Sequence, residues 1–176
     1  MPLKRIRKRL TVEEHQGLIQ MARRKTSKKL KIIFVDEVND LQSQIAEHFL
    51  REEYGDMYEA FSAGPKKDYI NCELISVMYQ AGYDMRRQRS KDFDFPGLPK
   101  KPDYIVFLEE STYNLLKDVM PWDAKQILKA FRREDSYKGA TDDLELAQMI
   151  SSFVESVRMW VHETFSDPDK LEELAR

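Results

Sequence analysis

Residues 36–43 bring together side chains that could handle an anion or a cation. In chain order they are Asp36, Glu37, Val38, Asn39, Asp40, Leu41, Gln42 and Ser43. The three carboxylates could hold a hard cation such as Mg²⁺ or Ca²⁺, or they could face water. A carboxylate can also attack phosphorus when a divalent cation screens the repulsion. The segment contains no Lys or Arg that would balance its three negative charges.

An apolar run precedes this segment, and a helical pattern follows it. Residues 30–35 are apolar and rich in β-branched side chains, which predicts a buried parallel strand. Residues 45–50 carry apolar side chains at helical spacing. In a parallel sheet, ligands bind at the carboxyl ends of the strands, near the point where the strand order reverses. The loop 36–42 is therefore the predicted functional site.

The rest of the chain continues this alternation of strand and helix. Further strands are expected at 58–63, 104–108 and 124–128, and helices at 74–81, 111–119 and after residue 141. Thr141 is a candidate N-cap of the last helix. The alternation predicts an α/β fold with a parallel sheet and right-handed crossovers.

The N-terminal segment differs from the rest in charge. Residues 1–31 carry eleven Lys or Arg and two acids, a net charge of +9, whereas the remainder carries 18 basic and 29 acidic residues, a net charge of −11. Thr11 and Glu14 have the spacing of a capping box, which predicts a helix that ends near residue 25. Residues 1–31 could contact an acidic partner, a nucleic acid or a membrane surface, or fold back on the acidic domain. No aromatic residue lies among these charges, which disfavours stacking on single-stranded nucleic acid.

Length and composition set the broad class. The 176 residues include 41% hydrophobic and 34% charged residues, which suits one folded domain with a solvated surface. No apolar run approaches the roughly 20 residues of a membrane span, and no secretory signal pattern follows the basic start. The expectation is a soluble, cytoplasmic protein. We expect a basic, partly helical arm at 1–29, a domain at 30–166 and a C-terminal tail at 167–176.

Several stretches in a fixed order carry a resemblance to a known family. They are Lys31–Val35, Asn39, Ser43–Glu47, Ser62–Gly64, Ile75–Gly82, Asp84, Arg89–Ser90, Asp103–Val106 and Asp135–Gly139. From about Lys31 to Phe165, their order and spacing resemble the low-molecular-weight protein tyrosine phosphatases and the arsenate reductases of the same fold. The resemblance implies a three-layer α/β/α fold with a four-stranded parallel sheet.

The resemblance also implies a phosphate loop with a cysteine and an arginine separated by five residues. In such a loop a thiolate attacks phosphorus, and the arginine binds two of its oxygens. Aligned on Asn39 and Ser43, the cysteine position is Asp36 and the arginine position is Gln42. The loop glycine position is Val38, whose β-branch suits an unusual φ poorly. We expect the Asp36 carboxylate to accept backbone N–H bonds of the loop in place of phosphate.

The remaining candidate residues have alternative roles. Asp135 aligns with the general acid of the family but also suits an ordinary turn. Cys72, the single cysteine, excludes an internal disulfide and the cysteine relay of the reductases; it could be a thiol of lowered pKa or a small buried hydrophobe. Three aromatic residues could form a rim of the cleft or pack in the core: Tyr113, Trp122 and Tyr137. His15, His48 and His162 lack the spacing of metal ligands.

Together these features predict a catalytically inactive relative, a pseudophosphatase that acts by binding or regulation. No catalytic residue is assigned, no metal or cofactor is expected, and the ligand-binding segment is residues 36–43. Two alternatives remain open: a phosphoryl-handling enzyme that uses Asp36 with a divalent metal, and a nucleic-acid-associated protein that binds through the basic arm.

Overall fold

The computed structural model describes residues 11–26 and 28–176 of the chain. Its central sheet has four parallel strands in the order β2-β1-β3-β4, so β1 is flanked on both sides. The strands are β1 (Leu30–Val35), β2 (Tyr58–Ala63), β3 (Tyr104–Phe107) and β4 (Lys125–Leu128). These bounds confirm the four predicted strands to within a residue or so at each end.

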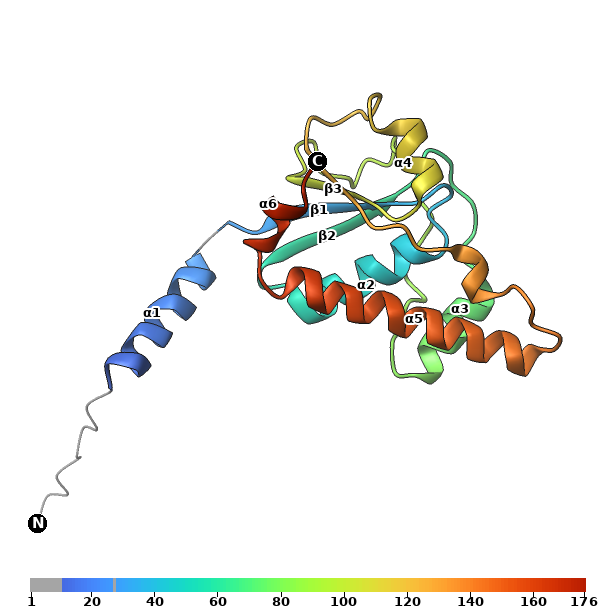
Figure 1. Ribbon diagram of the computed structural model, residues 1–176, viewed down its shortest axis with the longest axis horizontal. Helices are drawn as coiled ribbons and strands as arrows, with labels where there is room; N and C mark the ends of the chain where they lie inside the picture. The colour runs from blue at the N-terminus through green and yellow to red at the C-terminus, as the bar shows by residue number, and fades with distance from the viewer. Residues whose placement is uncertain (1–10, 27) are drawn as a thin grey trace, which may run out of the picture.

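Helices cover both faces of the sheet, which gives the predicted three layers (Figure 1). Helices α2, α3 and α5 lie on one face, and α4 lies on the other. The helices are α1 (Val12–Thr26), α2 (Gln42–Tyr54), α3 (Cys72–Gln80), α4 (Glu110–Leu116), the 3₁₀ helix η1 (Arg133–Ser136), α5 (Asp143–Phe165) and α6 (Lys170–Leu174). In the described part of the chain, no helix combines the length and the apolar character that crossing a bilayer requires.

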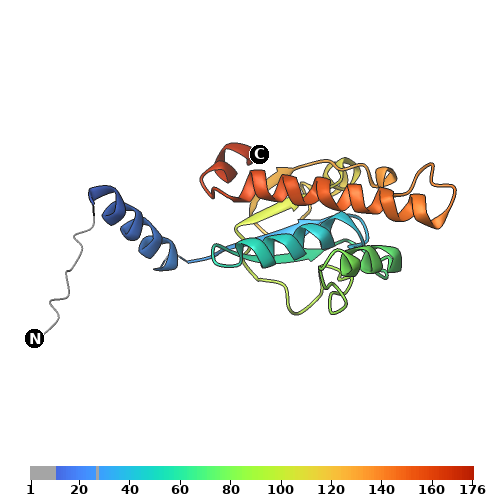
Figure 2. The same cartoon turned by 90° about the horizontal axis from the view of Figure 1, so that it is seen from below.

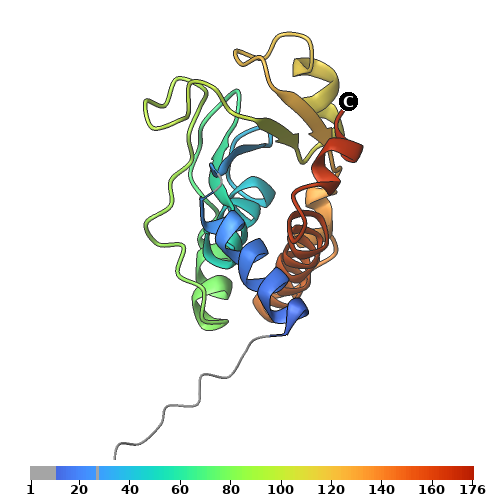
Figure 3. The ribbon, with the colours of Figure 1, turned by 90° about the vertical axis from the view of Figure 1, so that its left-hand side faces the viewer.

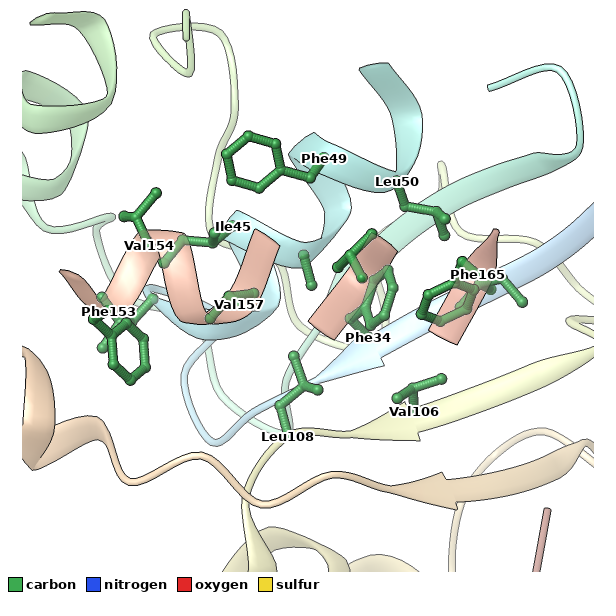
Figure 4. Packing of buried hydrophobic residues seen from close by; sticks show 14 of the residues in the cluster. Phe34, Ile45, Phe49, Leu50, Val106, Leu108, Phe153, Val154, Val157 and Phe165 are labelled. Carbon is green, nitrogen blue, oxygen red and sulfur yellow. The ribbon is translucent and has the colours of Figure 1, made fainter. Parts of the chain in front are cut away.

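Alternate side chains of β1 enter two separate cores, as the period of a strand requires. Ile32 and Phe34 enter the larger core, which α2 and α5 cover, whereas Ile33 and Val35 enter a smaller core on the α4 side. Figure 4 shows Phe34 packed among side chains of α2 and α5. Both faces of β1 are therefore buried, which explains its continuous apolar run.

The longest helix begins one residue later than its predicted cap implies. The side chain of Asp142, not of Thr141, accepts a hydrogen bond from the Glu145 N–H at 2.8 Å. The Thr141 hydroxyl instead donates to the Glu145 carboxylate at 2.8 Å. From this start α5 runs first beside α3 and then beside α2 (Figure 2).

The two ends of the chain differ in how they meet the domain. The predicted capping box is confirmed, because the Glu14 N–H donates to Thr11 Oγ1 and the Thr11 N–H donates to the Glu14 carboxylate. Helix α1 lies apart from the sheet in Figures 1 and 2, and residues 12–20 are exposed. The start of the arm, residues 1–10, lies outside the described residues.

Residues 167–176, expected as a tail, are packed on the domain. Leu171 in α6 is fully buried in the larger core. The Glu172 carboxylate accepts a hydrogen bond from the Tyr104 hydroxyl at 3.0 Å, and the Arg176 N–H donates to the Gln126 carbonyl at 2.8 Å. The C-terminal segment thus completes the core and the β4 edge.

We predict that Leu171→Ala lowers the free energy of unfolding by ~2–5 kcal/mol, because it opens a cavity in the core. Leu174→Ala, in the same helix but at a side chain that is 46% exposed, is the matched control and should change the free energy little. Urea unfolding followed by circular dichroism measures both. Equal, small effects of the two substitutions would contradict the packing of α6.

Candidate functional site

The predicted functional loop lies at the carboxyl end of β1, at the centre of the sheet. The chain leaves β1 at Asp36 and enters α2 at Gln42. From β1 the chain runs through α2 to β2 on one side, and from β2 it crosses back through α3 to β3 on the other side of β1, so the strand order reverses at this point. A helix N-terminus at such a reversal presents backbone N–H groups and a positive dipole end, a setting that attracts anions.

Asp36 lies fully buried at the base of this loop. Its Oδ2 accepts a hydrogen bond from the Ser43 N–H at 2.9 Å, whereas its Oδ1 has no hydrogen-bond partner among the described residues. The pKa of Asp36 is raised to about 7. Burial is the main cause, the charges of Glu109 and Asp40 add to the rise, and the hydrogen bonding of Ser43 opposes it. Near neutral pH, Asp36 therefore exchanges between its acid and carboxylate forms.

A second carboxylate, Glu109, enters the loop from the end of β3. Its Oε2 accepts the Glu37 N–H at 2.9 Å and the Thr112 hydroxyl at 2.8 Å. Its Oε1 accepts a hydrogen bond from Gln42 Nε2 at 2.7 Å. The predicted occupation of the loop by Asp36 is thus only partly right, because Asp36 accepts one loop N–H, that of Ser43, and Glu109 accepts another, that of Glu37.

A cation reaches the loop from η1 on the opposite side. The Arg133 guanidinium binds both oxygens of Asp40, at 3.0 and 2.7 Å, and its Nη1 lies 3.9 Å from Glu109 Oε1. The hydrogen bonds to Asp40 raise the pKa of Arg133. The expectation of an acidic loop without a balancing cation is therefore corrected: the cation comes from a segment about 90 residues away in the chain.

The backbone of the loop is fixed by Asn39. This residue has a φ of 51°, in the left-handed region that asparagine tolerates, so the unusual conformation falls at Asn39, next to the aligned glycine position Val38, whose β-branch suits it poorly. Its side-chain amide donates to Ser43 Oγ at 2.9 Å. Its Oδ1 accepts the Lys91 N–H and Gln44 Nε2, each at 2.8 Å. One buried side chain thus joins the loop, the start of α2 and the segment before β3.

Gly64 allows the end of β2 to approach the loop closely. A Cβ atom at this position would lie 2.6 Å from the Asp36 carbonyl oxygen and 2.8 Å from that of Glu37. Such contacts are too short for any side chain, so the approach requires glycine. The Ser62–Gly64 stretch of the resemblance therefore has a steric role beside the loop.

Asp135 takes a different position from the loop carboxylates. It lies in η1 with 60% of its side chain exposed, and its nearest ionic contact is Arg132 Nε at 3.9 Å. No hydrogen bond or ion pair of the described residues joins it to residues 36–43. The structure therefore brings Arg133, two positions earlier, to the loop in its place.

The three aromatic candidates do not gather into one rim. Tyr113 packs edge-on against Phe107, with ring centroids 5.3 Å apart. Trp122 packs edge-on against Phe93 at 5.4 Å. Both rings belong to the smaller core, which favours their packing role, whereas Tyr137 is 49% exposed.

Cys72 lies in a different environment from either one predicted. Cys72 is exposed, and its thiol donates to the Glu73 carboxylate, which raises the pKa of the thiol; both expected roles are therefore wrong.

In the part of the chain that the structure describes, no group of three or more His, Cys, Asp or Glu side chains converges as metal ligands would. The Asp40 carboxylate binds the Arg133 guanidinium, and the Glu37 side chain is exposed.

Two residues of this site, Glu109 and Arg133, escaped sequence reasoning. Glu109 directly follows the apolar run 104–108, just as Asp36 directly follows the apolar run 30–35. Because parallel strands end at the same edge, this spacing could have placed both carboxylates together. Nothing in the local sequence distinguishes Arg133 from Arg132 beside it.

Comparisons with known proteins agree with this fold. The family model described as low molecular weight phosphotyrosine protein phosphatase matches residues 31–157. An arsenate reductase of Bacillus licheniformis is 30% identical over 80 residues, which cover 46% of this chain and 57% of that protein. The chain thus matches little more than half the length of this relative.

Solved structures show the same fold. The tyrosine phosphatase amsI of Erwinia amylovora superposes with a TM-score of 0.59 and 14% identity, over 86% of this chain and 97% of that one. The tyrosine phosphatase Wzb of Escherichia coli K30, solved in complex with sulphate, superposes with a TM-score of 0.56 and 17% identity, over 77% of this chain and 99% of that one. Since the family model spans well over half of the sequence, this chain belongs to the low molecular weight phosphotyrosine protein phosphatase family.

Proposed function

We propose that this chain is a catalytically inactive member of its family, a pseudophosphatase that acts by binding. The observation that carries the proposal is the use of two loop N–H groups. The N–H of Glu37 and that of Ser43 donate to the protein's own carboxylates, Glu109 and Asp36. In a phosphate loop, such N–H groups would instead face the oxyanion.

The side chains at the aligned catalytic positions support the same proposal. The resemblance places Asp36 where the family has its nucleophilic cysteine, and Gln42 where it has its arginine. A carboxyl group whose pKa is raised to about 7 is partly protonated at neutral pH, and the protonated form is no nucleophile, while a neutral amide lacks the charge that binds two phosphate oxygens. Here the Gln42 amide instead binds Glu109.

Electrostatics oppose a bound phosphate. A dianion at ~4 Å from one ionised carboxylate is disfavoured by several kcal/mol at an effective dielectric constant near 20. Asp36, Asp40 and Glu109 all lie at the loop, and Arg133 is already bound to both oxygens of Asp40. Recruiting Arg133 to a phosphate would leave Asp40, which is 8% exposed, without its cation.

The role of the basic arm in binding is a second part of this proposal. Residues 12–20 of α1 are exposed, and the helix lies apart from the domain (Figure 1). The net charge of +9 over residues 1–31 suits an acidic protein surface or a nucleic acid. We therefore propose that the arm supplies an electrostatic contact to an acidic partner.

We expect the purified chain to hydrolyse an aryl phosphate no faster than buffer, with or without Mg²⁺. The reason is that no thiolate stands at position 36 and the loop donors are occupied. A sensitive release assay measures this, with Asp36→Asn as the control variant. Turnover that disappears in Asp36→Asn would contradict the proposal and would favour the metal-assisted aspartate mechanism.

The pH dependence of stability tests the setting of Asp36. Because its pKa is raised in the folded state, the stability that it contributes is present below its unfolded value near 4 and is lost as the pH rises to about 7. Asparagine cannot ionise, so Asp36→Asn removes this loss. Between pH 4 and pH 8 we expect the free energy of unfolding of the variant to rise by ~2–4 kcal/mol relative to that of the parent chain.

Urea unfolding at several pH values measures this difference. Asp118→Asn, which removes an exposed carboxylate, is the matched control and should run parallel to the parent curve. If Asp36→Asn also ran parallel, the carboxylate would have the same pKa in the folded and unfolded chains, and its described burial would be wrong.

For the arm, we expect binding to labelled duplex DNA or polyglutamate that weakens as salt rises. Arg23→Gln combined with Arg24→Gln should lower the salt dependence for duplex DNA by about two units of log–log slope. Lys100→Gln combined with Lys101→Gln removes the same charge from the exposed surface of the domain and is the control. Fluorescence anisotropy measures the binding; no binding to either probe would refute the role of the arm.

A further inference from the structure

A groove separate from the loop lies between α2, β2 and the segment 84–98. Its volume is about 740 Å³, and its lining includes Arg51, Phe61, Arg87, Arg89, Phe95 and Leu98. Figure 3 shows the segment between α3 and β3 running along the β2 side of the domain. Neither the family resemblance nor the loop chemistry assigns a role to this 84–98 groove.

The acidic residues of the groove wall already have cationic partners. Glu47 contacts Lys91 Nζ and Arg51 Nη1, each at 3.3 Å. Asp84 binds Arg86 through two hydrogen bonds of 2.9 and 2.8 Å. Glu52 lies 3.7 Å from Arg51 Nε. The acids of the wall are therefore neutralised within the protein.

Two cations of the same wall lack such partners. Among the described residues, no ion pair or hydrogen bond involves the guanidinium group of Arg87 or that of Arg89, and both side chains are exposed. With Arg86 counted as the partner of Asp84, five cations stand against three acids at the groove, an excess of two positive charges, although residues 32–176 have a net charge of −11. Guanidinium groups bind carboxylates through two parallel hydrogen bonds, so this excess suits a carboxylate ligand.

Part of the groove lining is apolar. Phe61 from β2, Phe95 and Leu98 line it, and Phe95 is 43% exposed. The Phe95 ring lies against Gly97, where a Cβ atom would come within 2.5 Å of the ring. An exposed aromatic ring beside arginines is the usual composition of a protein-binding hot spot.

We propose that the 84–98 groove binds a short segment of a partner protein in which carboxylates flank an apolar side chain. The carboxylates would pair with Arg87 and Arg89, and the apolar side chain would contact Phe95. A nucleic acid fits less well, since its phosphates extend beyond the groove onto an acidic domain surface, where like charges repel. A short acidic segment avoids that repulsion because its charges end within the groove.

The groove and the loop share one stretch of backbone. The Arg89 carbonyl accepts Gln44 Nε2 at 2.8 Å, and the Lys91 N–H donates to Asn39 at 2.8 Å. A ligand that contacts Arg87 and Arg89 therefore binds a segment that holds the loop in place.

The experiment probes the full chain on an array of short peptides that carry Glu or Asp beside an apolar residue. A matched array has Gln or Asn in place of each acid. We expect the chain to prefer the acidic array, and the strongest peptide is then measured by fluorescence anisotropy. Arg87→Gln combined with Arg89→Gln should weaken that peptide about tenfold or more.

Two further variants separate charge from packing. Lys100→Gln combined with Lys101→Gln, which removes the same net charge outside the groove lining, should change the affinity less than about twofold. Phe95→Ala should weaken peptides with a large apolar side chain more than those with alanine there. Thermal unfolding of each variant confirms that the fold is kept.

Three results would overturn the inference. The first is an acidic array that binds no better than its amide counterpart. The second is an Arg87→Gln/Arg89→Gln variant that binds the peptide like the parent chain. The third is labelled duplex DNA that binds more tightly than any peptide and loses its affinity with the same two arginines, which would assign the groove to nucleic acid.

Discussion

A buried carboxylate has to be satisfied by hydrogen bonds, by a cation or by a proton, and this constraint organises the carboxyl edge of the sheet. Asp36 lies fully buried at the end of β1 with one hydrogen bond to Ser43 and one oxygen without a partner. Glu109 and Asp40 place further negative charge beside it. The surrounding contacts follow from this charge: the Gln42 amide and Thr112 hydroxyl bind Glu109, while Arg133 binds Asp40. These contacts do not fully compensate the buried negative charge of Asp36. Its pKa therefore rises, and a proton neutralises part of that charge near neutral pH.

This arrangement ties together segments that are distant in the chain. Arg133 connects η1 to the loop, Glu109 connects the end of β3 to it, and Asn39 connects it to the segment before β3. The loop is therefore held from several sides by polar contacts made within the protein. In our proposal, function then depends on surfaces that remain exposed, the basic arm and the 84–98 groove, rather than on the loop itself.

Sequence patterns predicted the strands and helices because each of these elements depends on residues that are close together in the chain. The apolar runs at 30–35 and 104–107 predicted β1 and β3, since a strand buried on both faces has to be apolar throughout. The position of the functional loop followed from the rule for parallel sheets, and the family from the order of short stretches. The capping box at Thr11 and Glu14 is a contact between residues three apart, so it too was readable.

What the sequence did not predict are contacts between distant segments and choices between equivalent neighbours. Arg133 and Glu109 reach the loop only after the sheet has formed, and Leu171 enters the core only because α6 folds back on it. Asp142 rather than Thr141 caps α5, although both residue types suit an N-cap, so side-chain geometry decides this case. The left-handed conformation falls at Asn39, beside the aligned glycine position Val38, because asparagine tolerates it and a β-branched residue does not.

The central claim is that the protein's own carboxylates hold the loop N–H groups. The most direct measurement is a titration of the ¹⁵N-labelled chain with inorganic phosphate, followed by the amide resonances of Glu37 and Ser43. Our account predicts that these two resonances stay in place while phosphate rises at constant ionic strength. A saturable shift of both resonances would show an oxyanion bound in the loop and would contradict the account.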